Sequence, residues 1–367
     1  MMFLDVFGEV PDPRDFTSRY PLPEMLFIAL AAVLCGAQNC TEMALFARNR
    51  LDLLRQFIPL EHGAPSHDTF SRVLAALDPA AFNKAFMRFM EAFGAQARLD
   101  CPKGQVAIDG KSLRRAYAKG CAHMPPLVVT AFACDTFMSL SQVAAQKGGE
   151  AEAAIEALKL LSLKGLTVTG DALHCHRRMT KTIRDGGGDY VLAIKGNQSK
   201  LHGEASAALD KAETDGKTRF HQTTDERHGR HEVRRAFVIP FTQTPGAKAL
   251  VDLKAVARVE NWRSEGGKTT TKVRCYALSR IMTPQDLLAT VRRHWSIENN
   301  LHWQLDVLLQ EDRIRGRKTN SAANHAILRR MTLNILRADK QTIPLSHKRL
   351  KARWADQDFL KLLIHMR

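Results

Sequence analysis

The sequence contains no C-x-x-C pair, although it has seven cysteines. This odd number without paired spacing indicates a reducing compartment, and it argues against a disulfide framework or a zinc–thiolate site. The segment His174-Cys175-His176 could suggest a metal cluster. Because adjacent side chains in a helix or strand point in different directions, we interpret this segment as structural.

Long hydrophobic runs and targeting signals are also missing. The apolar run Met25–Ala37 spans 13 residues, too few to cross a bilayer, and follows Glu24. We find no signal peptide, no internal repeat and no low-complexity segment. These absences predict a soluble, cytoplasmic protein without a membrane partner, in which this run is a buried core helix.

Positive charge is abundant. The 367 residues carry a formal net charge of +16, and 45% of them are hydrophobic. This length suggests two or three domains with a packed core. The charge indicates a polyanionic partner, nucleic acid above all, rather than a merely basic surface.

The first 100 residues have a helical pattern. Predicted helices include Leu22–Cys40, a second one capped by Thr41, and Ala80–Ala97 with phenylalanines at helical spacing. The helix within Ser66–Asp78, capped by Ser66 or Asp68, could be a DNA recognition helix or an ordinary member of a bundle, and the sequence leaves both open.

Strand-like segments begin after residue 100. The pattern predicts a mixed α/β sheet over 101–198, a β-rich insertion over 199–283, and helices over 284–340 followed by a basic tail over 341–367. The predicted strands of the first part are Val106–Ser112, Leu127–Cys134, Met138–Gln146, Leu166–His174 and Asp189–Gln198, and those of the insertion are Glu232–Ile239, Leu250–Glu260 and Lys268–Ser279.

The stretch Arg292–Asp312 has neither proline nor glycine and predicts one continuous α-helix. One face of that helix would carry an apolar stripe interrupted only by a carboxylate and an imidazole. A carboxylate on a core-facing stripe is costly unless it is paired, and a divalent metal ion is one such partner. The stripe consists of Val291, Trp295, Glu298, His302, Leu305 and Leu309.

Two aspartates follow buried-looking strands: Asp109 after Val106–Ile108, and Asp171 after Val168–Gly170. Strand ends are where α/β sheets build sites, although each aspartate alone could be an ordinary turn residue. Together with Glu298 they would provide three carboxylates that can hold two Mg²⁺ ions for an in-line phosphoryl displacement.

The segments AIDGKSLR, VTGDALH, YVLAIKGNQ and RRHWSIENNLHWQLDVLLQED resemble the DDE transposases of bacterial insertion sequences, in the group with the H-repeat-associated proteins. The resemblance extends over almost the whole chain. It implies an RNase H-like core with a β-rich insertion, preceded by an all-α DNA-binding domain. The catalytic and metal-binding residues implied are Asp109, Asp171 and Glu298, with two ions of Mg²⁺ or Mn²⁺.

The same resemblance implies a transposase that cleaves and joins double-stranded DNA at terminal inverted repeats and at a target. It further implies a homodimer on DNA in the bacterial nucleoid. Within enzymes, the alternative is a metal-dependent nuclease without strand joining. Outside enzymes, it is a catalytically inactive DNA-binding remnant.

The sequence departs from many relatives around the glutamate, where they have tyrosine, arginine and lysine and this chain has Val291, His294 and Leu305. Other basic residues could contact phosphate instead, or could be solvated surface residues. The candidates are Lys111, Lys195, Arg292, Arg293, His302, Arg313 and Arg315.

Overall fold

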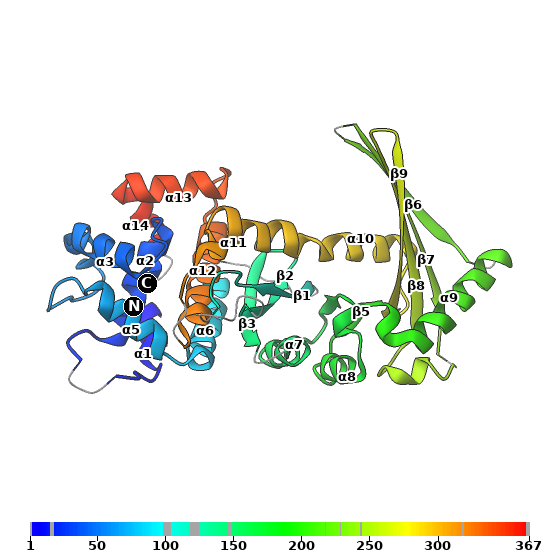
Figure 1. Cartoon of the computed structure of the whole chain (residues 1–367), viewed down its shortest axis with the longest axis horizontal. Helices are drawn as coiled ribbons and strands as arrows, with labels where there is room; N and C mark the ends of the chain where they lie inside the picture. Colours follow the sequence, from blue (N-terminus) through cyan, green and yellow to red (C-terminus); the bar gives the residue numbers. More distant parts are fainter. Residues whose placement is uncertain are drawn as a thin grey trace.

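The computed structural model describes residues 2–14, 18–97, 104–117, 125–145, 149–216, 218–227, 229–242, 244–316 and 319–364. Three parts follow one another along the long axis of the molecule: a helical region, a sheet flanked by helices, and a set of long projecting strands (Figure 1). Within the described ranges, no helix is long and apolar enough to span a membrane.

The N-terminal region is helical, as predicted. Helix α3 begins after Asn39, whose side chain accepts a hydrogen bond from the Glu42 amide, so the predicted cap Thr41 was wrong. Ser66 caps α5 by accepting from the Thr69 amide. The helices are α1 (Met2–Gly8), α2 (Leu22–Leu34), α3 (Cys40–Asn49), α4 (Leu51–Leu54), α5 (His67–Ala76) and α6 (Pro79–Ala97).

The last three helices pack into the same core as the first six. Helices α12 (Ser321–Ala338), α13 (Leu345–Trp354) and α14 (Asp356–Ile364) contribute buried residues such as Ile335 and Phe359. The Phe359 ring lies edge-on to Phe46, with centroids 5.9 Å apart. The two ends of the described chain therefore close one hydrophobic core (Figure 1).

The strands form one nine-stranded mixed sheet, in the order β3-β2-β1-β4-β5-β9-β8-β7-β6. Strands β1, β4 and β5 run parallel, and β2 and β3 extend that edge in antiparallel fashion. This confirms the predicted mixed sheet. The strands are β1 (Gln105–Ser112), β2 (Leu127–Ala133), β3 (Met138–Ala145), β4 (Thr167–Gly170), β5 (Asp189–Ile194), β6 (Phe220–Arg227), β7 (Arg230–Pro240), β8 (Ala255–Glu265) and β9 (Lys268–Leu278).

The strands of the insertion continue the central sheet, because β9 pairs with β5. Sequence analysis missed β6, whose residues FHQTTDER are mostly polar, and it began β8 at Leu250 instead of Ala255. The turns β6–β7 and β8–β9 lie at the projecting end of these strands (Figure 1).

Helices cover both faces of the sheet. One face packs against α7 (Glu150–Lys159), α8 (Arg177–Asp185) and α9 (Ser199–Thr214). The other face packs against α10 (Pro284–His294) and the turns that follow it. Successive residues of a strand point to opposite faces of the sheet. In β5, Val191 packs on the side of α10, and Leu192 packs on the side of α7, α8 and α9.

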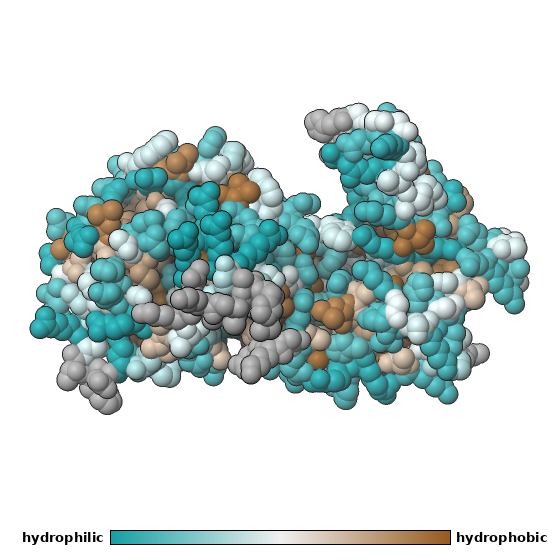
Figure 2. Space-filling model, viewed as in Figure 1, coloured by the Kyte–Doolittle hydropathy of each residue, from teal (hydrophilic) through white to brown (hydrophobic). Residues whose placement is uncertain are grey.

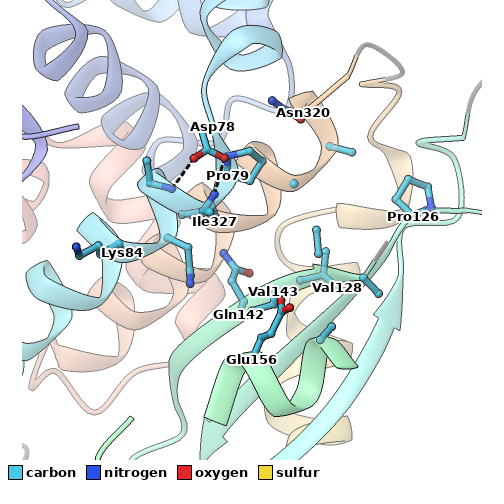
Figure 3. A pocket seen from close by; sticks show the side chains of 18 of the residues that line it. Asp78, Pro79, Lys84, Pro126, Val128, Gln142, Val143, Glu156, Asn320 and Ile327 are labelled. Carbon is cyan, nitrogen blue, oxygen red and sulfur yellow. Dashed lines mark hydrogen bonds between the residues drawn. The ribbon is translucent and has the colours of Figure 1, made fainter. Parts of the chain in front are cut away.

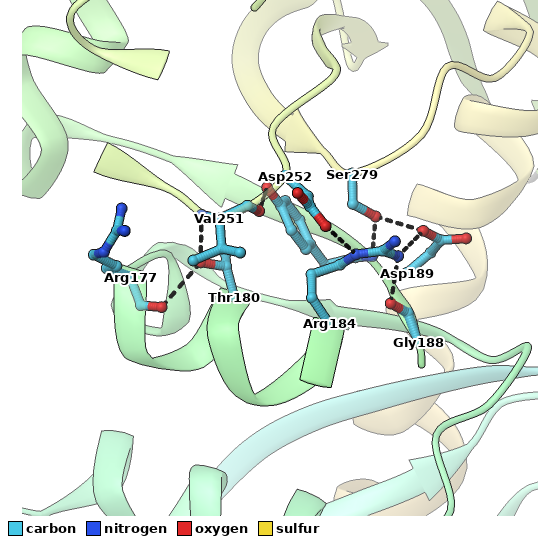
Figure 4. A network of polar contacts seen from close by, with 9 residues as sticks. Arg177, Thr180, Arg184, Gly188, Asp189, Val251, Asp252 and Ser279 are labelled. Carbon is cyan, nitrogen blue, oxygen red and sulfur yellow. Dashed lines mark hydrogen bonds and ion pairs between the residues drawn. The ribbon is translucent and has the colours of Figure 1, made fainter. Parts of the chain in front are cut away.

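A polar network anchors the insertion to the central strands (Figure 4). Arg184 of α8 pairs with Asp189 at the start of β5 and with Asp252 in the loop before β8. The Ser279 hydroxyl, just after β9, donates to Asp189 at 2.8 Å and accepts from the Tyr190 amide at 2.9 Å. These bonds fix the register between β5 and β9.

The predicted single helix over Arg292–Asp312 is interrupted. Thr283 caps α10 with Pro284 in its first turn, as predicted, but a π-helical stretch, Ile297–His302, separates α10 from α11 (Trp303–Val307). A π turn changes the phase of the helix. The predicted stripe was therefore wrong in part: Trp295 is 41% exposed and Glu298 is also exposed, whereas Leu305 and Leu309 are buried.

Candidate active site

The pairing of β1 with β4 brings two of the predicted carboxylates together. Ile108 pairs with Gly170 in parallel register, so Asp109 and Asp171 are the next residues on neighbouring strands. Strand β4 ends at Gly170, and Asp171 caps the following turn by accepting from the Leu173 amide at 2.9 Å. The two aspartates thus lie side by side where β4 ends, although Asp109 lies within β1 and not at its end as predicted.

The π-helical stretch brings Glu298 and His302 to Asp109. The distance from His302 Nδ1 is 3.5 Å to Glu298 Oε2 and 3.7 Å to Asp109 Oδ2. One ligand atom from each of these three residues lies within 4.8 Å of the others, which is compatible with a shared metal ion. The side chains come from strand β1 and from one helical turn packed across it.

The electrostatics of this group follow from burial and close packing of like charges. Burial, with the charges of Glu298 and Asp171, raises the pKa of Asp109 to about 6, although His302 opposes the rise. The hydrogen bond to His302 lowers the pKa of the more exposed Glu298 carboxyl. Asp109 therefore holds its charge at a cost, which a bound cation would offset.

Asp171 lies beside this group rather than within the three-residue cluster. Its side chain is half-exposed, and its Oδ1 lies 3.9 Å from Nε2 of the buried His174. Asp171 is close enough for its charge to raise the pKa of Asp109. The structure thus brings together Asp109, Glu298 and His302, with Asp171 adjacent.

Three further ionisable residues lie next to the carboxylates but were not among the predicted site residues: His294, His174 and Glu150. His294 Nδ1 lies 3.0 Å from the Thr169 hydroxyl, and burial lowers the pKa of His294 to about 4. The sequence signal for His294 was its place in the RRHWSIENN segment. Glu150 begins α7, far along the chain from each aspartate, and nothing in its local sequence marks it.

The predicted phosphate contacts have different surroundings. Lys111 is buried, with its Nζ 2.8 Å from Asp306 Oδ1 and 3.2 Å from Asp312 Oδ1. Its ammonium is thus shared by two carboxylates and faces away from solvent. Lys195, directly after β5, is exposed.

The predicted arginines lie at the surface. Arg292 pairs with Asp225 of β6 at 3.3 Å, and Arg293 pairs with Asp135 at 3.0 Å. Arg313 and Arg315 are exposed after α11. The face in Figure 2 is mostly hydrophilic, and its outline is indented above α10 between the helical region and the projecting strands.

A separate cavity of about 1200 Å³ lies away from these carboxylates, between α6, β3, α7 and the start of α12 (Figure 3). The Gln142 side chain lines it and is 3% exposed. Among the described residues its amide has no hydrogen-bond partner. None of the predicted site residues lines this cavity.

Comparison with known proteins identifies the class. Residues 100–335 match the family described as transposase DDE domain, and residues 4–90 match the DDE_Tnp_1-associated family. The first match covers more than half of the chain. The protein therefore belongs to the DDE transposase family, as its sequence motifs suggested.

Individual relatives extend over most of the chain. The H repeat-associated putative transposase YhhI of Escherichia coli strain K12 is 30% identical over 96% of this chain and 94% of that protein. The putative transposase YncI of Escherichia coli O157:H7 is 33% identical, over 91% and 87%. An uncharacterized protein in the dhlA 3′ region of Xanthobacter autotrophicus is 35% identical, over 76% and 94%.

Family membership identifies the type of fold, the class of enzyme and the kind of metal ion that such a domain uses. The sheet and its covering helices form an RNase H-like catalytic core, preceded by a helical region. The protein is a transposase, a DNA-processing enzyme of recombination and transposition. DDE domains use divalent metal ions, and the Asp109–Glu298–His302 group provides suitable ligands for one.

Proposed function

We propose that this transposase cleaves DNA at the ends of an insertion sequence and joins the ends to target DNA, as a homodimer in the bacterial nucleoid. Asp109, Asp171 and Glu298 would be its catalytic residues and would hold two ions of Mg²⁺ or Mn²⁺. The observation that carries the proposal is the convergence of Asp109, Glu298 and His302, whose ligand atoms lie within 4.8 Å, beside Asp171.

The residues present fit a divalent cation. Two carboxylates and an imidazole can replace part of the water shell of Mg²⁺ or Mn²⁺. Nδ1 of His302 faces both carboxylates, 3.5 Å from Glu298 Oε2 and 3.7 Å from Asp109 Oδ2. When bound, two such ions would activate the attacking water or 3′-hydroxyl and stabilise the leaving oxygen.

The protein's own groups would position the DNA. Arg292 and Arg293 are exposed in the last turn of α10, six and five residues before Glu298 in the sequence. Their surface ion pairs with Asp225 and Asp135 are weak enough to be exchanged for phosphates. Lys195, Arg313 and Arg315 are further candidates at the surface.

The test uses the full-length protein and duplexes that carry the candidate element ends, taken from the DNA flanking the gene. With Mg²⁺ we expect nicking that exposes 3′-hydroxyl ends, followed by joining of those ends to a second duplex. Asp109→Asn and Glu298→Gln should abolish both steps. Glu156→Gln, at an exposed position of α7, is the matched control and should retain them.

The other outcomes separate the alternatives. Nicking without joining would identify a metal-dependent nuclease instead of a transposase of the proposed activity. Binding to the ends without any nicking, at every metal concentration tried, would identify an inactive DNA-binding protein. Full activity in Asp109→Asn would remove the proposed site.

A further inference from the structure

The His294 ring is held by a chain of hydrogen bonds that begins inside the sheet. Gln105, at the start of β1, is 4% exposed, and its Nε2 donates to the Thr290 backbone oxygen at 3.0 Å and to the Thr169 hydroxyl at 3.1 Å. The Thr169 hydroxyl in turn lies 3.0 Å from Nδ1 of His294. Because a backbone oxygen can only accept, the Gln105 amide has one possible orientation, with its nitrogen towards Thr169.

This chain determines which nitrogen of the His294 ring carries the hydrogen. The Thr169 hydroxyl accepts from Gln105, and its single hydrogen is left to be donated. Two acceptors lie near it, His294 Nδ1 at 3.0 Å and the Val106 backbone oxygen at 3.4 Å, and the shorter contact is the better hydrogen bond. Nδ1 therefore accepts, so Nε2 carries the ring hydrogen and is a donor.

The ring lies next to the carboxylates of the site. Thr169 and Asp171 are alternate residues of one extended segment, so they point to the same face of the sheet, about 7 Å apart. The negative charges of Asp171 and Glu298 act on His294, the last residue of α10. His294 is partly exposed, although its Nδ1 is bound to the buried Thr169. Nε2 is thus the ring nitrogen that is available to a substrate.

The His294 ring is also neutral at pH 7, because burial lowers its pKa to about 4. A cation at this position would pair with Asp171 and Glu298 and would compete with a metal ion for them. A neutral N–H donor avoids this competition and can still bind a phosphate oxygen.

We propose that His294 is a further catalytic residue, whose Nε2–H donates a hydrogen bond to a non-bridging oxygen of the scissile DNA phosphate. Gln105 and Thr169 are positioning residues that keep the hydrogen on Nε2. The inference rests on the proposed function, because this phosphate is the one that the carboxylates would cleave. A preformed donor stabilises the charge that develops on the oxygen, and the loss of such a donor lowers kcat by about 100-fold or more.

The first experiment compares two substitutions of His294 in Mg²⁺-dependent nicking of duplexes that carry the element ends. The amide nitrogen of glutamine can occupy the place of Nε2, whereas that of asparagine can occupy only the place of Nδ1. We expect His294→Asn to lower kcat about 100-fold and to leave KM for DNA within about twofold of the wild type. His294→Gln, which keeps a donor, should have a kcat at least about tenfold higher than His294→Asn.

A structural role of His294 would give the reverse order, because asparagine keeps the bond to Thr169 that joins α10 to β4 and glutamine does not. If His294→Asn nicks as fast as His294→Gln or the wild type, the proposal is wrong. His347→Asn, at an exposed position of α13, is the matched control and should leave kcat unchanged. Thermal melting of each variant verifies that it folds.

Substitutions of Thr169 test the positioning of the ring. Valine has the shape of threonine without the hydroxyl, so Thr169→Val should lower kcat at least about tenfold by releasing the ring hydrogen to either nitrogen. Thr169→Ser restores the hydroxyl and should restore kcat. In the His294→Gln background Thr169→Val should have no further effect, because an amide has no tautomer to select. If Thr169→Val nicks as fast as the wild type, Thr169 is not a positioning residue.

Nitrogen-15 magnetic resonance of the histidine rings gives a measurement that requires neither DNA nor a metal ion. The signals of His294 are those missing from the spectrum of His294→Gln. At pH 7 we expect Nδ1 to have the shift of a nitrogen without hydrogen and Nε2 that of a nitrogen with hydrogen. Thr169→Val should give a mixture of both tautomers. A hydrogen on Nδ1 in the wild type would overturn the proposal.

Asp109→Asn separates this inference from the proposed function. If Asp109→Asn abolishes nicking and His294→Asn does not lower kcat, only the role of His294 fails. If Asp109→Asn remains fully active while His294→Asn is impaired, the role of His294 stands and the carboxylate site is misassigned. If the wild type nicks no DNA under any condition, the proposed function fails and the role of His294 fails with it.

Discussion

Arg330 and Glu311 form an ion pair in which both side chains are completely buried, with 2.9 Å between Nη1 and Oε1. Nε of Arg330 also donates to the Thr130 hydroxyl at 3.0 Å. Thr130 pairs with Asp109 across β1 and β2. The arginine of α12 thus joins the segment following the Glu298 helix to the strand beside Asp109.

Breaking this pair from one side should destabilise the protein strongly. Arg330→Met leaves the Glu311 charge buried and unpaired, and we expect a loss of about 3–5 kcal/mol in the free energy of unfolding. Urea denaturation measures it. Arg230→Ala, which removes the exposed pair with Glu265, should cost less than about 1 kcal/mol. If the two variants lose similar amounts of unfolding free energy, the buried Arg330–Glu311 pair stabilises the protein no more than an exposed pair does.

The second prediction concerns Lys111, whose ammonium is held by Asp306 and Asp312. Lys111→Met should lower the free energy of unfolding by about 1–3 kcal/mol, because both carboxylates lose a buried partner. The salt dependence of DNA binding should stay as in the wild type. A reduction of the salt slope by about one phosphate, without loss of stability, would instead support a phosphate contact.

Cleavage and binding should separate in Asp109→Asn. The substitution removes a negative charge near the expected phosphates, so DNA affinity should be kept or increased while cleavage is lost. Binding isotherms at several salt concentrations measure the first effect, with a logarithmic slope near −0.9 per phosphate neutralised. If a folded variant loses binding and cleavage together, Asp109 has a structural role.

His325 should make the protein sensitive to acid. Burial, reinforced by Arg329, lowers the pKa of His325 from 6.5 to about 4, so the unfolded chain binds a proton at a pH where the folded chain does not. Above pH 6.5, His325 is neutral in both states and the free energy of unfolding is unaffected by its titration. As the pH falls below 6.5, protonation in the unfolded chain lowers the free energy of unfolding, and this loss is complete below about pH 4. The full effect is roughly 3 kcal/mol.

The measurement is the difference in unfolding free energy between wild type and His325→Gln, followed from pH 7 to pH 4. The free energy of unfolding of the wild type should fall relative to that of His325→Gln as the pH decreases through this range. His67→Gln, which replaces a histidine at an exposed position, is the matched control. Parallel curves for His325→Gln would mean that His325 binds its proton equally in the folded and unfolded chains.

The sequence predicted what depends on local pattern. The apolar strands around Asp109 and before Asp171 form where expected, although β1 continues through Asp109 to Ser112, and Thr283-Pro284 begins its helix because cap and first turn are local signals. Strand β6 was missed because its side chains are mostly polar and exposed, and it is defined by pairing with β7. Pairing across space has no signature in a single segment.

In the candidate site too, local sequence signals were predictable and contacts between distant segments were not. Family motifs pointed to Asp109 and Glu298, and the helical period already put His302 on the same face as Glu298, but an unbroken 3.6-residue period could not predict the π turn that contains both. Glu150 lies next to Gly110 only because α7 packs behind β1. Lys111 resembled a strand-end surface lysine until the fold placed Asp306 and Asp312 around it.

The core that both ends of the chain share has a consequence for synthesis on the ribosome. Residues 2–97 are translated first, yet their hydrophobic surface is completed by α12, α13 and α14. Domains that can fold during translation do so from the N-terminus, but this region must wait until α12, α13 and α14 have been synthesised. A gene copy truncated before the codons of α12 would therefore encode a chain with exposed apolar helices, prone to aggregation and proteolysis even with every carboxylate of the site intact.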